Sequence, residues 1–175
     1  MSLVLRKVRG DDWLPDVGGG RRSDDDVAAG HFQDPAGVSL WTIDPSETNL
    51  ERVIAAIAAC RDFLKPVEYL VFPETILAEL GIPLVVSEGD TPDAYANSTW
   101  HRHLAIDSQA EALRVVRALR TRGAECEPRR CPKPTVKMLL VQSVQSGHIQ
   151  LESLKDEVRT IVAKTIAQLG QAPHS

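Results

Sequence analysis

Hydrophobic residues recur along this chain in two patterns, and each pattern predicts one kind of secondary structure. Alternating or short continuous apolar stretches, bounded by turn residues, predict strands over residues 3–8, 38–43, 69–72, 84–86, 100–106 and 136–144. Apolar residues spaced by three and four positions predict helices over residues 48–65, 73–80, 108–122 and from about 152 to 169. Strands therefore alternate with helices along most of the chain.

Two of the predicted helices begin with a capping signal. Thr48 and Glu51 have the spacing of a capping box, with Thr48 as the N-cap residue. Ser108 and Glu111 repeat this spacing at the start of the helix that ends before Gly123.

The alternation of elements predicts an α+β or α/β fold. We expect a single domain over residues 1–175, with a mixed sheet of short strands and about four helices packed on it. The stretch over residues 10–37 is polar and has few apolar anchors, which predicts a long polar loop or mobile arm. The apolar faces predict a core that contains Leu50, Val53, Ile54, Ile57, Leu113, Val116, Leu139, Val141, Val158 and Ile161.

Composition places the chain among ordinary globular proteins. Of its 175 residues, 43% are hydrophobic and 25% are charged, which excludes a largely disordered or fibrous chain. No apolar stretch is long enough to cross a membrane, and the first residues lack the apolar core of a signal peptide. We therefore expect a cytoplasmic protein of bacterial type that has no membrane partner.

No motif in the sequence predicts a cofactor or a metal site. The glycine motifs of dinucleotide-binding and phosphate-binding loops are absent. The three cysteines, Cys60, Cys126 and Cys131, are an odd number, which does not suit a disulfide framework. We expect the protein to bind neither a cofactor nor a metal ion.

Charge is distributed unevenly along the chain. Residues 1–100 hold 8 Lys/Arg and 17 Asp/Glu, and residues 101–175 hold 12 and 7, so the net charges are −9 and +5. Arginines on the helix over residues 108–122 and in the segment after it predict one basic face, formed by Arg114, Arg117, Arg120, Arg129 and Arg130. This face suits an anionic partner, either an acidic protein surface or a nucleic acid backbone. It equally suits an acidic N-terminal segment that folds back on it.

Two histidines stand at positions i and i+2 of the strand predicted over residues 100–106. Because alternate residues of a strand share a face, His101 and His103 should project side by side. Such a pair can transfer protons or hold a metal, and it can also be an ordinary exposed strand face.

A third histidine begins a similar stretch, because His148-Ile149-Gln150-Leu151 repeats the pattern of His103-Leu104-Ala105-Ile106. The two stretches resemble the paired His-x-[Thr/Ser]-hydrophobic motifs of the 2H phosphoesterase family, in which each histidine exchanges a proton with a phosphodiester. Ala105 and Gln150 stand where that family has a hydroxyl, and the separation of 45 residues is short. The resemblance implies a phosphodiester-directed hydrolase in which His103 and His148 act. The hydrolase alternative uses these two residues together with His101.

The last predicted helix has an apolar seam with coiled-coil spacing. The seam contains Leu151, Leu154, Val158, Ile161 and Thr165, spaced by three and four residues over about two heptads. This helix can pack onto the sheet, or it can form a homodimer contact.

Without a specific catalytic motif, the sequence favours a small non-catalytic protein that binds a macromolecular partner, as accessory, regulatory or antitoxin-like proteins do. We expect a protein partner, with nucleic acid as the other possibility through the basic face. The alternative is the phosphodiester-directed hydrolase that uses the paired histidines.

Overall fold

Six strands form one sheet in the part of the chain that the structure, a computed structural model, describes. That part excludes residues 1, 10–11, 14–21, 34–36, 127 and 172–175. The strands are β1 (Leu3–Lys7), β2 (Val38–Ile43), β3 (Val67–Pro73), β4 (Leu84–Val86), β5 (His101–Leu104) and β6 (Pro128–Cys131). Neighbouring strands are antiparallel, in the order β4–β5–β2–β1–β3–β6.

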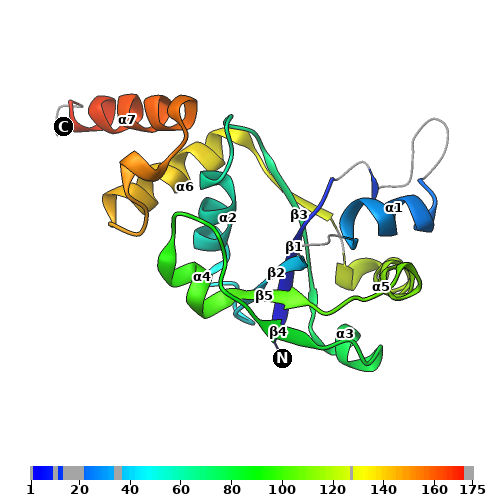
Figure 1. Ribbon diagram of the computed structural model, residues 1–175. Coiled ribbons are helices and arrows are strands. Elements are labelled where there is room, and N and C mark those ends of the chain that lie inside the picture. The colour runs from blue at the N-terminus through cyan, green and yellow to red at the C-terminus, as the bar shows by residue number, and fades with distance from the viewer. Residues whose placement is uncertain (1, 10–11, 14–21, 34–36, 127, 172–175) are drawn as a thin grey trace.

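Helices cover both faces of this sheet (Figure 1). One face is covered by α2 (Leu50–Ala59), α4 (Ala94–Trp100) and α6 (Lys133–Gln145), and α7 (Asp156–Gly170) packs outside α6. The other face is covered by α1 (Asp24–His31), α3 (Thr75–Glu79) and α5 (Gln109–Thr121). Within the described residues, no helix is long and apolar enough to span a membrane.

The alternation of side chains along the strands divides the core into two layers. Leu5 and Trp41 lie in the layer shared with α2, α6 and α7. Their neighbours Val4 and Leu40 lie in the layer shared with α1, α3 and α5. The central strands are therefore buried on both faces, and only the strand ends and the sheet edges reach solvent.

The α+β expectation is confirmed, and two of its details are wrong. The sheet is antiparallel rather than mixed, and the described residues contain seven α-helices rather than about four.

One source of the extra helices is residues 136–144, which were expected as a strand and belong to α6. Val136, Leu139, Leu140 and Ser143 are buried there at helical spacing. A short apolar run suits either element, but a proline in the first turn, here Pro134, favours a helix start.

Two stretches in which no helix or strand is predicted, residues 94–99 and 128–131, also contain regular structure. Residues 94–100 form α4, whose N-cap residue Asp93 accepts a hydrogen bond from the Ala96 amide at 3.0 Å. Residues 128–131, in the proline-bearing basic segment, form the edge strand β6, where Pro128 stands at the strand's first position. Both elements depend on neighbours that are distant in the sequence.

The loop predicted over residues 10–37 lies partly outside the described residues, at 10–11, 14–21 and 34–36. The prediction does not hold for residues 24–31, which form α1. Ser23 caps this helix by accepting a hydrogen bond from the Asp26 amide, and Val27, Ala28 and Phe32 are fully buried. These few apolar residues suffice because all three face the same core layer.

Of the two predicted capping boxes, one is found. Ser108 is the N-cap of α5 and accepts a hydrogen bond from the Glu111 amide at 3.2 Å. At α2 the N-cap is Asn49, without a side-chain cap, while the Thr48 hydroxyl donates to Asp44 at 2.5 Å. Because the Thr48 hydroxyl is bonded to Asp44 in the turn after β2, it does not cap the helix.

Most of the predicted core is buried, and the exceptions, Leu50, Leu113 and Ile161, are half-buried. The seam of the last helix faces inward, because Leu154, Val158 and Thr165 are buried beside α6. The homodimer contact remains a prediction, which would have to use other residues such as the exposed Leu169.

Candidate functional site

His101 and His103 lie side by side on β5, with their ring centroids 5.0 Å apart. His101 is 4% exposed, packs against Trp41, and has its Nδ1 atom 2.9 Å from Ser87 Oγ. The His103 ring covers Gly37, where φ is +93° and an added Cβ would lie 2.9 Å from that ring. Both imidazoles are therefore packing groups of the sheet surface.

The buried His101 ring predicts a pH-dependent stability. Burial lowers the pKa of His101, and the charges of His103 and Arg102 act in the same direction, although the contact with Ser87 opposes them. The unfolded chain therefore binds this proton first, and the free energy of unfolding should decrease as the pH falls below about 6.5. The decrease is at most about 1.4 kcal/mol per pH unit between the unfolded and folded pKa values. Denaturation curves between about pH 5 and pH 7 should show it, and His101→Asn should reduce it; an unchanged pH dependence in this variant would contradict the prediction.

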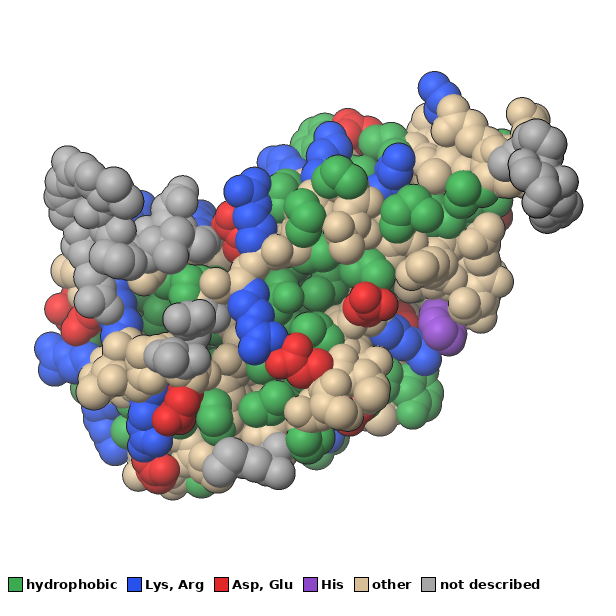
Figure 2. Space-filling view, turned by 180° about the vertical axis from the view of Figure 1, so that it is seen from behind, with side chains coloured by type: hydrophobic (Ala, Val, Ile, Leu, Met, Phe, Trp, Pro, Cys, Tyr) green, Lys and Arg blue, Asp and Glu red, His purple; other side chains and the backbone are tan. Residues whose placement is uncertain are grey.

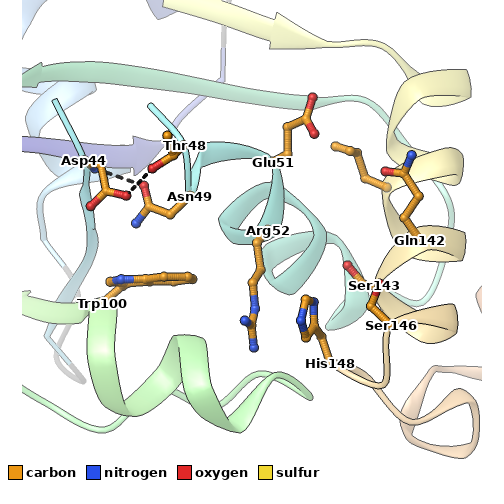
Figure 3. A pocket seen from close by; sticks show the side chains of 11 residues that line it. Asp44, Thr48, Asn49, Glu51, Arg52, Trp100, Gln142, Ser143, Ser146 and His148 are labelled. Carbon is orange, nitrogen blue, oxygen red and sulfur yellow. Dashed lines mark hydrogen bonds between the residues drawn. The ribbon is translucent and has the colours of Figure 1, made fainter. Parts of the chain in front are cut away.

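His148 lies elsewhere, in a cleft of about 570 Å³ between α2 and α6 (Figure 3). Neither His101 nor His103 lines this cleft. Figure 3 shows the His148 imidazole beside Arg52, below Ser143 and Ser146. The three histidines are not brought together, so the hydrolase hypothesis has no shared site among the described residues.

Arg52, the one arginine among the described residues that line this cleft, is already paired with a carboxylate. Arg52 donates two hydrogen bonds to Asp93, at 2.6 and 2.9 Å, and its guanidinium group lies 5.5 Å from the centroid of the Trp100 ring. The other charged residues that line the cleft, Asp44 and Glu51, are acidic. The cleft is therefore poorly suited to a phosphodiester.

The described residues also lack a metal site or an activated cysteine. No three of their His, Cys, Asp or Glu side chains are placed to hold a metal ion. Desolvation raises the pKa of Cys126 to about 11 and also raises the pKa values of Cys60 and Cys131. All three are thiols at neutral pH, and a thiol is a poor nucleophile.

The arginines expected to form one anion-binding face make contacts within the molecule. Their partners are the Leu80 carbonyl for Arg114, Asp24 for Arg117 and Arg120, Glu47 for Arg129 and Glu68 for Arg130. Asp24 belongs to α1, so the acidic N-terminal segment does fold back on part of this face. The Arg120 side chain is 6% exposed, whereas that of Arg117 is 62% exposed.

Basic side chains that form no ion pair with the described residues gather instead at the end of β1, beside the turn between α2 and β3, at the upper end of the sheet in Figure 1. We call this region the β1 basic groove and define it by Lys7, Phe63 and the residues Arg9, Arg61 and Lys65. It consists of two adjoining hollows, of about 420 and 440 Å³, that share Lys7 and Arg9. Figure 2 shows that Lys and Arg side chains on one face of the molecule border exposed hydrophobic side chains, with Asp and Glu side chains among them.

Local structure explains why these residues meet. β1 pairs with β3, so that Lys7 lies opposite Tyr69, and the Val8 amide donates to the Glu68 carbonyl at 3.0 Å. α2 ends at Ala59, and Pro66 stands directly before β3. The turn over residues 61–66 is therefore held next to the end of β1.

The described residues place no carboxylate within ion-pair distance of the four cations of the groove, although the charge of Glu68 acts on Arg61. None of the ion pairs formed by these residues includes Lys7, Arg9, Arg61 or Lys65. Arg61 donates to the Pro66 carbonyl at 2.7 Å, which fixes its position and leaves its charge. The Lys65 ammonium lies 5.6 Å from the centroid of the Phe63 ring.

Acidic residues reduce this charge only in part. Asp62 and Glu68 line the second hollow, and Glu68 lies 3.8 Å from Arg130 of β6. Desolvation in the hollow lowers the pKa of Lys7, even though its side chain reaches solvent. The positive charges of Arg61, Arg6 and Arg9 lower it further. Mutual repulsion of this kind is relieved when an anion binds.

The sequence contains the basic residues of this groove in two separate segments, and nothing in the sequence indicates that the two segments meet. Arg6 and Lys7 lie in the first predicted strand, with Arg9 directly after it. Arg61, Phe63 and Lys65 lie in the last part of the helix predicted over residues 48–65, a part that the structure places after the end of α2 at Ala59. Only the pairing of β1 with β3 brings the two segments together.

No protein-family model matches the chain, and no curated protein and no solved structure is significantly similar to it. The fold and the site define its class by themselves. It is an α+β protein with an antiparallel six-stranded sheet in its described residues and a basic groove at one end of that sheet.

Proposed function

We propose that this protein is a non-catalytic binding protein that takes up a phosphate-bearing macromolecule in the β1 basic groove. The observation that carries the proposal is the gathering of four cations, without carboxylate partners among the described residues, around two adjoining hollows. A fold does not keep like charges together for stability, because they repel one another. A bound polyanion compensates them.

The size of the groove favours a polymer over a single phosphate. Lys7 and Arg9 form the wall common to both hollows, while Arg61 and Lys65 line only the second. A chain of phosphates that crosses this wall can reach all four cations in turn. Each exposed pair contributes little, so useful affinity requires several contacts at once.

Binding of polyanions at two salt concentrations tests the proposal. We expect the protein to bind a fluorescent oligonucleotide and inorganic polyphosphate at low salt. The logarithm of the binding constant should fall with the logarithm of salt concentration with a slope of about −3, because four cations displace counterions. The double variant Lys7→Glu/Arg9→Glu should bind at least about tenfold more weakly, since both exposed cations become repulsive.

A matched control is available on α5. The variant Arg114→Glu/Arg117→Glu changes the charge by the same amount on the face that the sequence singles out, and both side chains are exposed. It should bind within about threefold of the unchanged protein, because it lies outside the groove. Absence of binding to either polyanion at low salt, or equal losses in the two variants, would overturn the proposal.

A further inference from the structure

Phe63 places an exposed aromatic ring among the cations of the β1 basic groove. Its side chain is 53% exposed, although a phenyl ring is normally buried, and it lines the second hollow together with Arg61 and Lys65. The Lys65 ammonium lies 5.6 Å from the ring centroid, so charge and apolar surface are presented side by side.

Resting on the proposed function, we infer that the macromolecule is a single-stranded nucleic acid, one base of which stacks on Phe63. A nucleotide offers a phosphate to the cations and a flat apolar face to the ring in the same unit. Basic grooves with exposed aromatic rings are the usual arrangement for binding single strands.

The groove distinguishes this ligand from two related ones. In a duplex the bases are stacked on one another, and their faces are not accessible to Phe63 without unpairing. An acidic protein surface would satisfy Lys7 and Arg9, but its carboxylates would leave the Phe63 ring in solvent. Phosphate contacts would hold the strand in both hollows, and the stacked base would lie only in the second.

A double-mutant cycle tests the stacking directly. The probes are an oligothymidine of about twelve nucleotides and an abasic strand of the same length, which match the size of known single-strand sites. Phe63→Ala should weaken binding of oligothymidine about tenfold and leave binding of the abasic strand unchanged. Phe63→Trp should retain the affinity, since it keeps an aromatic face.

The matched control is Tyr95→Ala, which removes another aromatic ring that is 53% exposed but lies on α4, outside the groove. It should bind oligothymidine as the unchanged protein does. A duplex of the same sequence and poly-L-glutamate, tested in parallel, should both bind more weakly than the single strand.

The outcomes separate this inference from the proposed function. Lys7→Glu/Arg9→Glu could abolish binding while Phe63→Ala keeps the affinity of the unchanged protein and the abasic strand binds as tightly as oligothymidine. In that case the stacking inference is wrong and the polyanion proposal stands. Poly-L-glutamate bound as tightly as oligothymidine would identify an acidic protein as the partner and overturn the inference. If no polyanion binds, both the stacking inference and the polyanion proposal are wrong.

Discussion

Replacing Arg120 by alanine should lower the free energy of unfolding by about 2–4 kcal/mol, because it removes a buried guanidinium group that pairs with the half-buried Asp24 carboxylate and donates to two backbone carbonyls. The guanidinium group donates to the Asp24 carboxylate, to the Asp12 carbonyl at 2.7 Å and to the Arg22 carbonyl at 3.2 Å. It also lies 5.6 Å from the centroid of the Trp13 ring. This one side chain therefore connects α5 to α1 and to the residues before α1.

Arg117 offers a matched control for this prediction. It contacts the same Asp24 carboxylate, at 3.6 Å, but its side chain is 62% exposed. Arg117→Ala should cost less than about 0.5 kcal/mol, because solvent screens an exposed pair. Urea denaturation of the two variants provides the comparison. Equal losses would show that the burial of Arg120 does not determine its contribution.

A change of Asp93 to alanine should cost about 3 kcal/mol, since it breaks a pair and removes a helix cap. The Asp93 carboxylate is fully buried, accepts two hydrogen bonds from Arg52, and accepts a third from the Ala96 amide at the start of α4. Burial alone would raise the pKa of Asp93, but the bonds from Arg52 and Ala96 outweigh it, so that the pKa is lowered. The stabilisation is therefore present above about pH 4 and is lost as the pH falls through the folded pKa.

One further variant separates the two contributions of Asp93, its charge and its helix cap, and a second variant serves as an exposed control. Asp93→Asn keeps an acceptor for the Ala96 amide and loses the charge, so it should fall between alanine and the unchanged protein. Asp156→Ala breaks an exposed pair with Arg159, in which Asp156 is 93% exposed, and should change stability by less than about 0.5 kcal/mol. Denaturation at pH 7 measures the cost of each substitution, and denaturation at pH values below about 4 measures the loss of the Asp93 stabilisation. If Asp93→Ala costs no more than Asp156→Ala, the buried pair is not a determinant of stability.

Arg120 and Arg117 show why the partners of the basic residues could not be predicted from the sequence. Arg120 stands in a regular row with Arg114 and Arg117, and the row suggests one exposed face. The helix does place them near one another, but α1 covers Arg120 and leaves Arg117 in solvent. Lys7 and Arg61, which belong to no such row, form no ion pair with the described residues. A sequence indicates the sign of a charge, whereas its partners come from distant segments.

The contacts of the histidines, like those of the arginines, depend on segments that are distant in the sequence. The period-two spacing of His101 and His103 correctly predicts that they share a strand face. Their relation to His148 is a tertiary property, because it depends on where α6 ends relative to β5, and the structure places His148 in a separate cleft. Proximity within one element was predictable, and proximity between elements was not.

The sequence alone determined the local elements whose apolar residues repeat with a clear period. It determined the strands β1, β2, β3, β4 and β5, the helices α2, α3, α5 and α7, most of the core, and the α+β class. Only the tertiary structure decided that residues 136–144 are helical, that α1 docks on α5, and that β1 lies next to β3. The physical reason is that short apolar runs and polar helices take their conformation from what they pack against. The β1 basic groove exists for the same reason: the pairing of β1 with β3 holds Lys7 and Arg61 together against their mutual repulsion.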